Sequence, residues 1–98
     1  MTRQDKIDYR REWARQRRGE SYSYINKYKS DNGCTDCGET DWRVLEFDHL
    51  RDKFMDVSKM VARCFTLDKI REEIEKCEVV CANCHRIRGF NRRHGEGG

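Results

Sequence analysis

The hydrophobic residues of the chain fall into short stretches whose periods predict helices and a well-defined strand. Residues 4–18 are good helix formers without glycine or proline, and Tyr9 and Trp13 lie four positions apart, so a helix is expected that ends at Gly19. A second helix is expected over 21–30. Its tyrosines either pack against the core or stack on bases, and packing is the favoured interpretation.

The segment 43–50, RVLEFDHL, alternates between apolar and polar positions, as a half-buried strand does. Asp48 and His49 come at its end and are expected to point to opposite faces. Further elements follow from the same reasoning: helices over 57–64 and 67–77, a short strand at 78–80, and a final basic helix over 85–93.

Composition adds a stability problem. The chain has 98 residues, of which 36% are hydrophobic and 40% are charged, and its mean hydropathy is −1.10. A domain of this length buries little apolar surface and commonly depends on a metal ion or disulfides. Its first residues lack the apolar core of a signal peptide, and no stretch approaches the roughly 18 apolar residues of a membrane span. We therefore expect a cytoplasmic protein whose thiols are reduced and bind metal.

Charge is unevenly distributed, although the formal net charge is only +3. Residues 1–18 hold seven Lys and Arg against three acids, residues 35–84 hold eight against twelve, and residues 85–94 hold four arginines and no acid. A single basic segment of this kind could be a helix face that is exposed to solvent. Two basic ends beside a metal-site pattern favour a polyanion, with nucleic acid as the expected partner.

The cysteines carry the clearest chemical pattern. There are six, and four of them form two C-x-x-C pairs with 43 residues between the pairs. Four thiolates complete the tetrahedral coordination of Zn²⁺, and a closed site of this kind is structural. The predicted ligands are Cys34, Cys37, Cys81 and Cys84, while Cys64 and Cys77 are expected to be buried apolar residues, with Cys77 in place of Cys81 as the less well spaced alternative.

A histidine, His85, follows the last cysteine directly and has no place on an ion that four sulfurs already fill. Asp48 and His49 offer a carboxylate and an imidazole at the end of the predicted strand. If the second cysteine pair lies beside this strand, His85 can face Asp48, and such a pair with open positions suits Mg²⁺ or a transition metal. His49 points the other way and is then available as a general base.

Together these residues resemble the HNH endonuclease family, the zinc-bound branch of the ββα-metal nucleases. The matching segments are CTDCG, LEFDHL and CEVVCANCHRIR, within residues 34–88. The resemblance implies a small zinc-stabilised α+β domain, whose ββα-metal core carries additional N-terminal and insert helices. We expect one domain over 1–98, with a basic helical extension at 1–30 and a nuclease core with two zinc knuckles at 31–94.

The resemblance also implies roles for single residues. Asp48 and His85 match the ligands of a catalytic divalent ion, which is Mg²⁺, Mn²⁺ or another transition metal. His49 matches the general base that activates water for hydrolysis of a phosphodiester bond. The family's middle asparagine, which orients the base, is not matched: its place holds Lys76, and Asn83 inside the second knuckle is the nearest candidate.

DNA is the implied substrate, held mainly through its backbone and either nicked or cut on both strands. A monomer is expected, in a bacterial cell or phage-infected host, with phage packaging proteins as further partners and no membrane. The residues expected to contact phosphates are Arg86, Arg88, Arg92 and Arg93 near the C-terminus and Arg10 and Arg11 in the N-terminal helix.

Two other functions are consistent with part of the pattern. A zinc-dependent DNA-binding module without catalysis explains the cysteines and arginines, but it leaves Asp48, His49 and His85 without a role. A zinc domain for protein interaction leaves the two basic ends unexplained. The nuclease is therefore the favoured interpretation.

Overall fold

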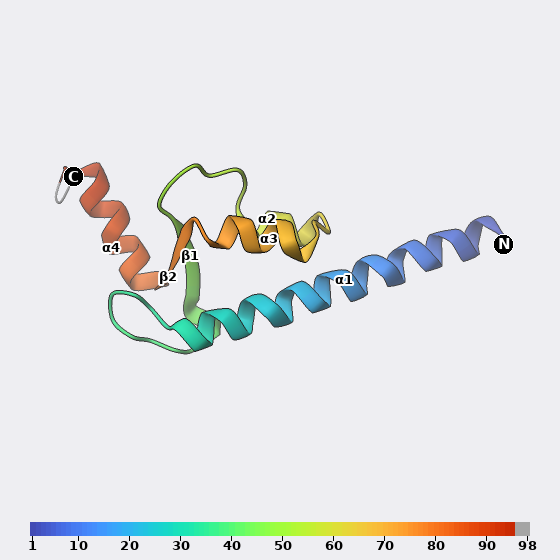
Figure 1. Ribbon diagram of the computed structural model, residues 1–98, viewed down its shortest axis with the longest axis horizontal. Coiled ribbons are helices and arrows are strands. Elements are labelled where there is room, and N and C mark those ends of the chain that lie inside the picture. Colours follow the sequence, from blue (N-terminus) through green and yellow to red (C-terminus); the bar gives the residue numbers. More distant parts are fainter. Residues whose placement is uncertain (96–98) are drawn as a thin grey trace.

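The computed structural model describes residues 1–95, so the last three residues of the expected domain lie outside the described part. The protein is a small, elongated α+β structure of 59 × 25 × 19 Å, in which one long helix runs along most of its length (Figure 1). In chain order, its elements are α1 (Arg3–Asn32), the 3-10 helix η1 (Trp42–Val44), β1 (Leu45–His49), α2 (Val57–Ala62), α3 (Leu67–Ile74), β2 (Cys77–Cys81) and α4 (Ala82–Arg93).

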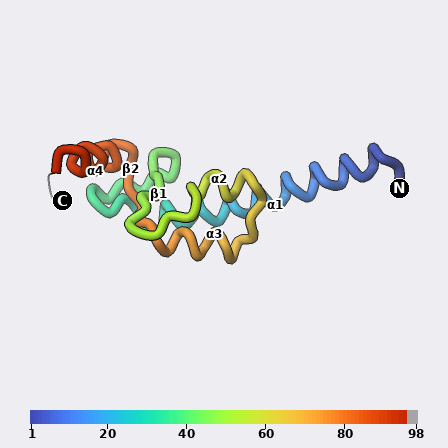
Figure 2. The backbone as a smooth tube through the Cα atoms, turned by 90° about the horizontal axis from the view of Figure 1, so that it is seen from above, coloured from blue at the N-terminus to red at the C-terminus, as the bar shows by residue number. Residues whose placement is uncertain are grey.

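The first half of α1 extends beyond the other elements (Figure 2). It begins with a capping box, because the Thr2 hydroxyl accepts from the Asp5 amide and the Asp5 carboxylate accepts from the Thr2 amide, both at 3.1 Å. Over residues 3–16, only Ile7 and Ala14 are partly shielded from solvent. This half therefore presents its basic side chains to solvent and is stabilised by local interactions.

The expected interruption of the N-terminal helix is wrong: α1 runs without a break through Gly19. A glycine inside a helix costs about 1 kcal/mol relative to alanine. The helix tolerates this cost because Ser21 and Ile25, two and six residues further on, are buried against the rest of the protein. It ends at Gly33, which has a φ of 70° and whose amide donates to the Lys29 carbonyl at 2.8 Å.

The two strands form an antiparallel pair in which Leu45 lies opposite Cys81 and His49 lies opposite Cys77. Both predicted strands are confirmed. The first begins at Leu45, because the preceding residues form η1, which the Asp41 carboxylate caps by accepting from the Arg43 amide at 3.0 Å. The pairing brings the end of β2, and with it the second C-x-x-C pair, beside the start of β1.

Helices α2 and α3 form the insert between the strands and are shorter than expected. Helix α2 ends before Cys64, whose φ of 58° places it in a left-handed turn, so the prediction that Cys64 is helical is wrong.

The tyrosines of the second half of α1 pack as expected. The main core joins α1, α2 and α3 through Ile25, Val57, Met60, Val61, Ile70 and Ile74, with Tyr24 and Tyr28 against it.

Helix α4 begins at Ala82, three residues before the expected start, because Cys81 caps it by accepting from the Cys84 amide at 3.4 Å. Gly89 does not interrupt it. The helix packs on both strands at the end of the protein opposite the N-terminus (Figure 1). A second, smaller core of Cys34, Leu45, Val79, Val80 and Cys81 links the sheet to the cysteines.

Candidate functional site

Four cysteine sulfurs converge where the turn after α1 meets the junction of β2 and α4. The Sγ atoms of Cys34, Cys37, Cys81 and Cys84 all lie within 4.8 Å of one another, and Cys37 and Cys81 are 3.7 Å apart. A tetrahedral zinc ion with bonds of about 2.3 Å separates its sulfurs by about 3.8 Å. The cluster could therefore hold a structural metal ion such as zinc, with the ligands that the spacing predicts.

The backbone around the first pair forms the tight turn that such a site needs. Gly38 has a φ of 83°, which a glycine adopts without strain, and its amide donates to the Cys34 carbonyl at 2.8 Å. The Thr35 amide donates to the Val79 carbonyl at 2.8 Å and ties the turn to β2. Burial acts to raise the pKa of Cys34, but backbone amides, the largest contribution coming from Cys81, outweigh it and bring the pKa to about 6. The thiolate form of Cys34 is thus favoured, whereas the neighbouring cysteines raise the pKa values of Cys37 and Cys84.

The other two cysteines lie outside this cluster and are half-buried. Burial, reinforced by the nearby charge of Glu73, raises the pKa of Cys77 to about 11, so this thiol stays protonated at neutral pH. Cys64 lies 3.7 Å from an Arg18 guanidinium nitrogen, in the turn between α2 and α3. Neither contributes a ligand to the four-sulfur cluster.

His85, on the first turn of α4, lies between two carboxylates of β1. Its Nδ1 is 2.7 Å from Glu46 Oε1, and its Nε2 is 3.6 Å from Asp48 Oδ1. A carboxylate only accepts hydrogen bonds, so Nδ1 carries the proton and the lone pair of Nε2 faces Asp48 in the neutral ring. Two acceptors that face each other favour a cation between them. The sequence predicts the pairing of His85 with Asp48, but it does not predict Glu46.

Asp48 is buried although the strand pattern places it on the polar face, because two arginines of α4 cover it. Arg88 Nη1 lies 2.8 Å from Asp48 Oδ2, and Arg92 contacts both oxygens at 2.9 and 2.7 Å. Burial acts to raise the pKa of Asp48, but the hydrogen bonds from Arg92 and Arg88 outweigh it and lower the pKa. Asp48 is therefore an ionised, fully paired carboxylate.

The predicted DNA-contacting arginines differ in their surroundings. Arg88 joins three carboxylates, because besides Asp48 it contacts Asp36 with two 2.7 Å hydrogen bonds and Glu78 at 3.0 Å. It thereby ties the first cysteine turn to both strands. Arg92 also contacts Asp48, but about half of its side chain is exposed to solvent. The remaining predicted contacts are exposed to solvent: Arg86, Arg93, Arg10 and Arg11.

His49, at the end of β1, pairs with a residue that the sequence analysis did not single out. Its Nε2 lies 2.8 Å from Oε2 of Glu73, a buried glutamate of α3. Asn83, the expected orienting residue, lies instead on the exposed start of α4, where it lines a surface pocket with Cys37 and Cys81. The sequence does contain a signal for Glu73. It is next to Ile74 in the apolar stripe of α3, and the structure buries this face of the helix.

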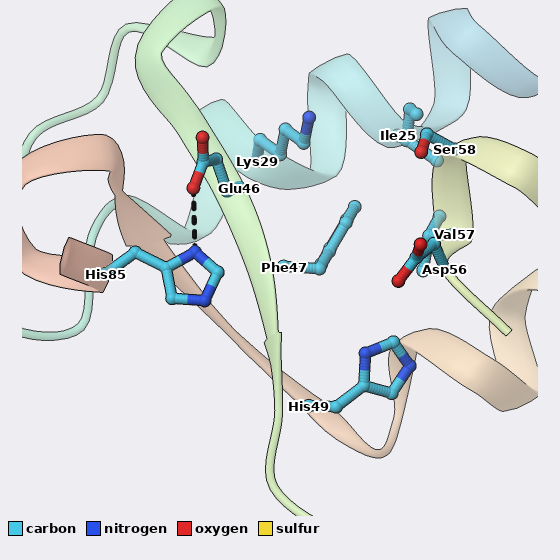
Figure 3. A pocket seen from close by; sticks show the side chains of 9 residues that line it. All are labelled: Ile25, Lys29, Glu46, Phe47, His49, Asp56, Val57, Ser58 and His85. Atoms are coloured by element: carbon cyan, nitrogen blue, oxygen red, sulfur yellow. Dashed lines mark hydrogen bonds and ion pairs between the residues drawn. The ribbon is translucent and has the colours of Figure 1, made fainter. Parts of the chain in front are cut away.

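A cavity of about 290 Å³ brings the two histidines to one surface (Figure 3). His49 and His85 line it together with Phe47 and Lys29, and the Lys29 ammonium lies 5.2 Å from the centre of the Phe47 ring. Burial lowers the pKa of Lys29. The carboxylates of Glu46 and Asp56 also line the cavity, which therefore combines two imidazoles and a lysine with two acidic groups.

Comparisons with protein-family models, with curated proteins and with solved structures found no match for this chain. Over residues 1–95, no helix is both long and apolar enough to cross a membrane.

Proposed function

We propose that this protein is a metal-dependent DNA endonuclease of the HNH type. The observation that carries the proposal is the shared cavity: His49 and His85 line it from different elements, and the Nε2 atom of His85 faces Asp48. In this proposal β1, β2 and α4 form the ββα unit. The four-cysteine cluster is its structural zinc site and holds α4 against the sheet.

Asp48 and His85 are the proposed ligands of the catalytic divalent ion. Two neighbouring ligands with bonds of about 2.1 Å lie about 3.0 Å apart, so the 3.6 Å between Asp48 Oδ1 and His85 Nε2 fits one shared ion after a small rotation of either side chain. Glu46 holds the proton on Nδ1 of His85, the arrangement by which carboxylates orient metal-binding histidines. A divalent ion supplies Lewis-acid stabilisation of the leaving oxygen when bound.

His49 is the proposed general base. It takes a proton from water, whose oxygen forms the new bond to phosphorus while the bond between phosphorus and the leaving oxygen breaks. Nε2 of His49 is turned to Glu73, so Nδ1 is the nitrogen that remains for the water molecule. The proposal places the scissile phosphate in the cavity, with Lys29 near its charge.

The backbone of DNA is the proposed partner of the exposed basic residues. Arg86 and Arg93 lie along α4 beside His85, around a shallow surface pocket that Gly89 also lines. Arg10 and Arg11 extend the contact along the protruding half of α1. Contacts of this type position a duplex without reading its sequence.

A non-catalytic zinc-dependent DNA-binding module is the second candidate, and one observation favours it. Asp48 is fully paired with Arg88 and Arg92, and Arg92, which contacts Oδ1 at 2.9 Å, must give way before that oxygen binds a metal ion. The two candidates differ in one outcome, because only the nuclease cleaves DNA.

The test is nicking of supercoiled plasmid by the zinc-loaded protein with Mg²⁺ or Mn²⁺, and with EDTA as the control. We expect metal-dependent conversion to open circles. His49→Ala should retain zinc and DNA binding and lose about 10²–10⁴ in rate, the contribution of a general base. If wild-type protein binds DNA but does not nick it with either ion, the binding module replaces the nuclease.

A further inference from the structure

Glu73 is a carboxylate in an apolar position. It lies on the buried face of α3 beside Ile74 and is 2% exposed, whereas its neighbour Glu72 is exposed. An ionised carboxylate away from water is unfavourable unless hydrogen bonds and charges compensate for its lost hydration. The surroundings of Glu73 provide this compensation and at the same time indicate what the residue does.

Four groups converge on the two oxygens of Glu73. Oε2 accepts from the amides of Phe54 at 2.9 Å and Met55 at 3.4 Å, and it lies 2.8 Å from His49 Nε2. Oε1 accepts from Lys76 Nζ at 2.9 Å, and the same ammonium donates to the Asp52 carbonyl at 3.0 Å. One carboxylate therefore joins the end of β1, the loop that follows it and the end of α3.

These contacts determine the state of the imidazole. Because an ionised carboxylate has no proton to donate, Nε2 of His49 must carry the proton of their hydrogen bond. The lone pair of the neutral ring then lies on Nδ1, for which residues 1–95 provide no hydrogen-bond partner. The ring belongs to the wall of the cavity (Figure 3).

We propose that Glu73 is a positioning residue that holds His49 in the Nε2–H tautomer, so that the basic Nδ1 faces the cavity, with Lys76 keeping the carboxylate in place. The role as a base rests on the proposed nuclease function; the control of the tautomer does not. Lys76 occupies the position where the HNH pattern has its orienting asparagine. In this chain, the Lys76–Glu73 pair orients His49 in place of that asparagine side chain.

The experiment is long-range ¹H–¹⁵N NMR of the imidazole nitrogens in zinc-loaded protein, with His49→Ala used to assign the signals. At a pH where the His49 ring is neutral, wild-type protein should show the Nε2–H tautomer. Glu73→Gln removes the charge but keeps the size, and the amide can donate as well as accept. We expect it to give a mixture of tautomers or the Nδ1–H form, while Glu72→Gln, the same change on an exposed neighbour, leaves the wild-type spectrum.

Several results would overturn the proposal. A predominant Nδ1–H tautomer of His49 in wild-type protein would overturn it. This measurement needs no variant, so the proposal can be tested even if Glu73→Gln does not fold. An unchanged tautomer in folded Glu73→Gln, with wild-type zinc content, would also overturn it. If the wild-type protein nicks DNA, Glu73→Gln should slow it about 10²-fold. A wild-type protein that does not nick contradicts the nuclease and leaves the tautomer measurement to decide the positioning role.

Discussion

Arg92 and Asp48 form a two-point ion pair, with Nη1 2.9 Å from Oδ1 and Nη2 2.7 Å from Oδ2. Arg92 Nη1 therefore occupies Oδ1, the Asp48 oxygen that faces His85 Nε2. If Asp48 and His85 bind a divalent ion, the ion must compete with the Arg92 guanidinium for the same atom. Binding of a phosphate by Arg92 would relieve that competition.

Replacing Arg92 by alanine should therefore strengthen binding of Mn²⁺ to zinc-loaded protein in the absence of DNA. A hydrogen bond to a charged group contributes about 1.5–3 kcal/mol, so an affinity increase of about tenfold or more is expected. Calorimetric titration with Mn²⁺ measures it, and Arg93→Ala, at an exposed neighbour, is the matched control. Equal Mn²⁺ affinities in wild type and Arg92→Ala would contradict an ion at Asp48.

The four-cysteine cluster should carry a large share of the stability. Cys37→Ser or Cys84→Ser should yield protein without zinc that is unfolded or aggregated, because metal binding and folding are coupled in a domain with so small a core. Metal analysis and circular dichroism measure the two effects. Cys64→Ser, at a cysteine outside the cluster, should keep one zinc per chain. Zinc-free Cys37→Ser that folds like wild type would exclude a structural ion.

Binding to DNA should depend on the exposed arginines of α4, Arg86 and Arg93, which have no ion pair among residues 1–95. The double change Arg86→Ala and Arg93→Ala should weaken binding to all duplexes alike and reduce the salt slope by roughly one unit per lost phosphate contact. Arg43→Ala is the matched control, because Arg43 lies outside both basic segments and is paired with Asp41 at 2.8 Å. Fluorescence anisotropy at several salt concentrations measures the slopes, and a slope unchanged in the double variant would argue against this surface.

Replacing Arg88 should have a different effect from replacing the exposed arginines. Arg88 is mostly buried and joins Asp36, Asp48 and Glu78, so Arg88→Ala leaves the buried Asp48 with Arg92 as its remaining arginine partner. The lost charged hydrogen bonds should cost about 1.5–3 kcal/mol of stability. Thermal unfolding of zinc-loaded protein measures the loss, with Arg86→Ala as the control. A melting temperature equal to that of wild type would show that the network contributes little.

Glu73 should make the stability of the protein sensitive to acid. Burial by itself raises the pKa of Glu73, but hydrogen bonds from Lys76, the Phe54 amide and His49 bring it from 4.5 to about 2. A carboxylate whose pKa is lower in the folded state contributes stability above pH 4.5, and this contribution is lost as the pH falls towards 2. We expect about 1–3 kcal/mol from this source.

The measurement is the free energy of unfolding from pH 6 to pH 2 for wild type, Glu73→Gln and Glu72→Gln. Release of zinc in acid affects all three, so the difference between proteins at each pH is the informative quantity. The advantage of wild type over Glu73→Gln should shrink as the pH falls, and Glu72→Gln should follow wild type. A constant difference across the range would show that Glu73 is not held ionised.

The sequence alone determined the features that depend on local pattern. The doubled C-x-x-C spacing identified the four sulfurs, because the turn that brings two cysteines to one ion spans only a few residues. Alternation over residues 43–50 identified the strand that the structure has at 45–49, and a 3.6-residue apolar stripe identified α3. His85, directly after the last cysteine, was expected to face Asp48 on the condition that the second cysteine pair lies beside this strand, and the strand pairing of the structure meets that condition.

The tertiary structure decided the features that depend on contacts between distant segments. His49 and Glu73 are 24 residues apart, and Asp48 and Arg92 are 44 apart. No periodicity links such pairs. Gly19 lies inside a helix because packing further along the chain outweighs its weak helix propensity. Whether a charged side chain is solvated or buried with a partner is set by what covers it, and only the folded chain determines that.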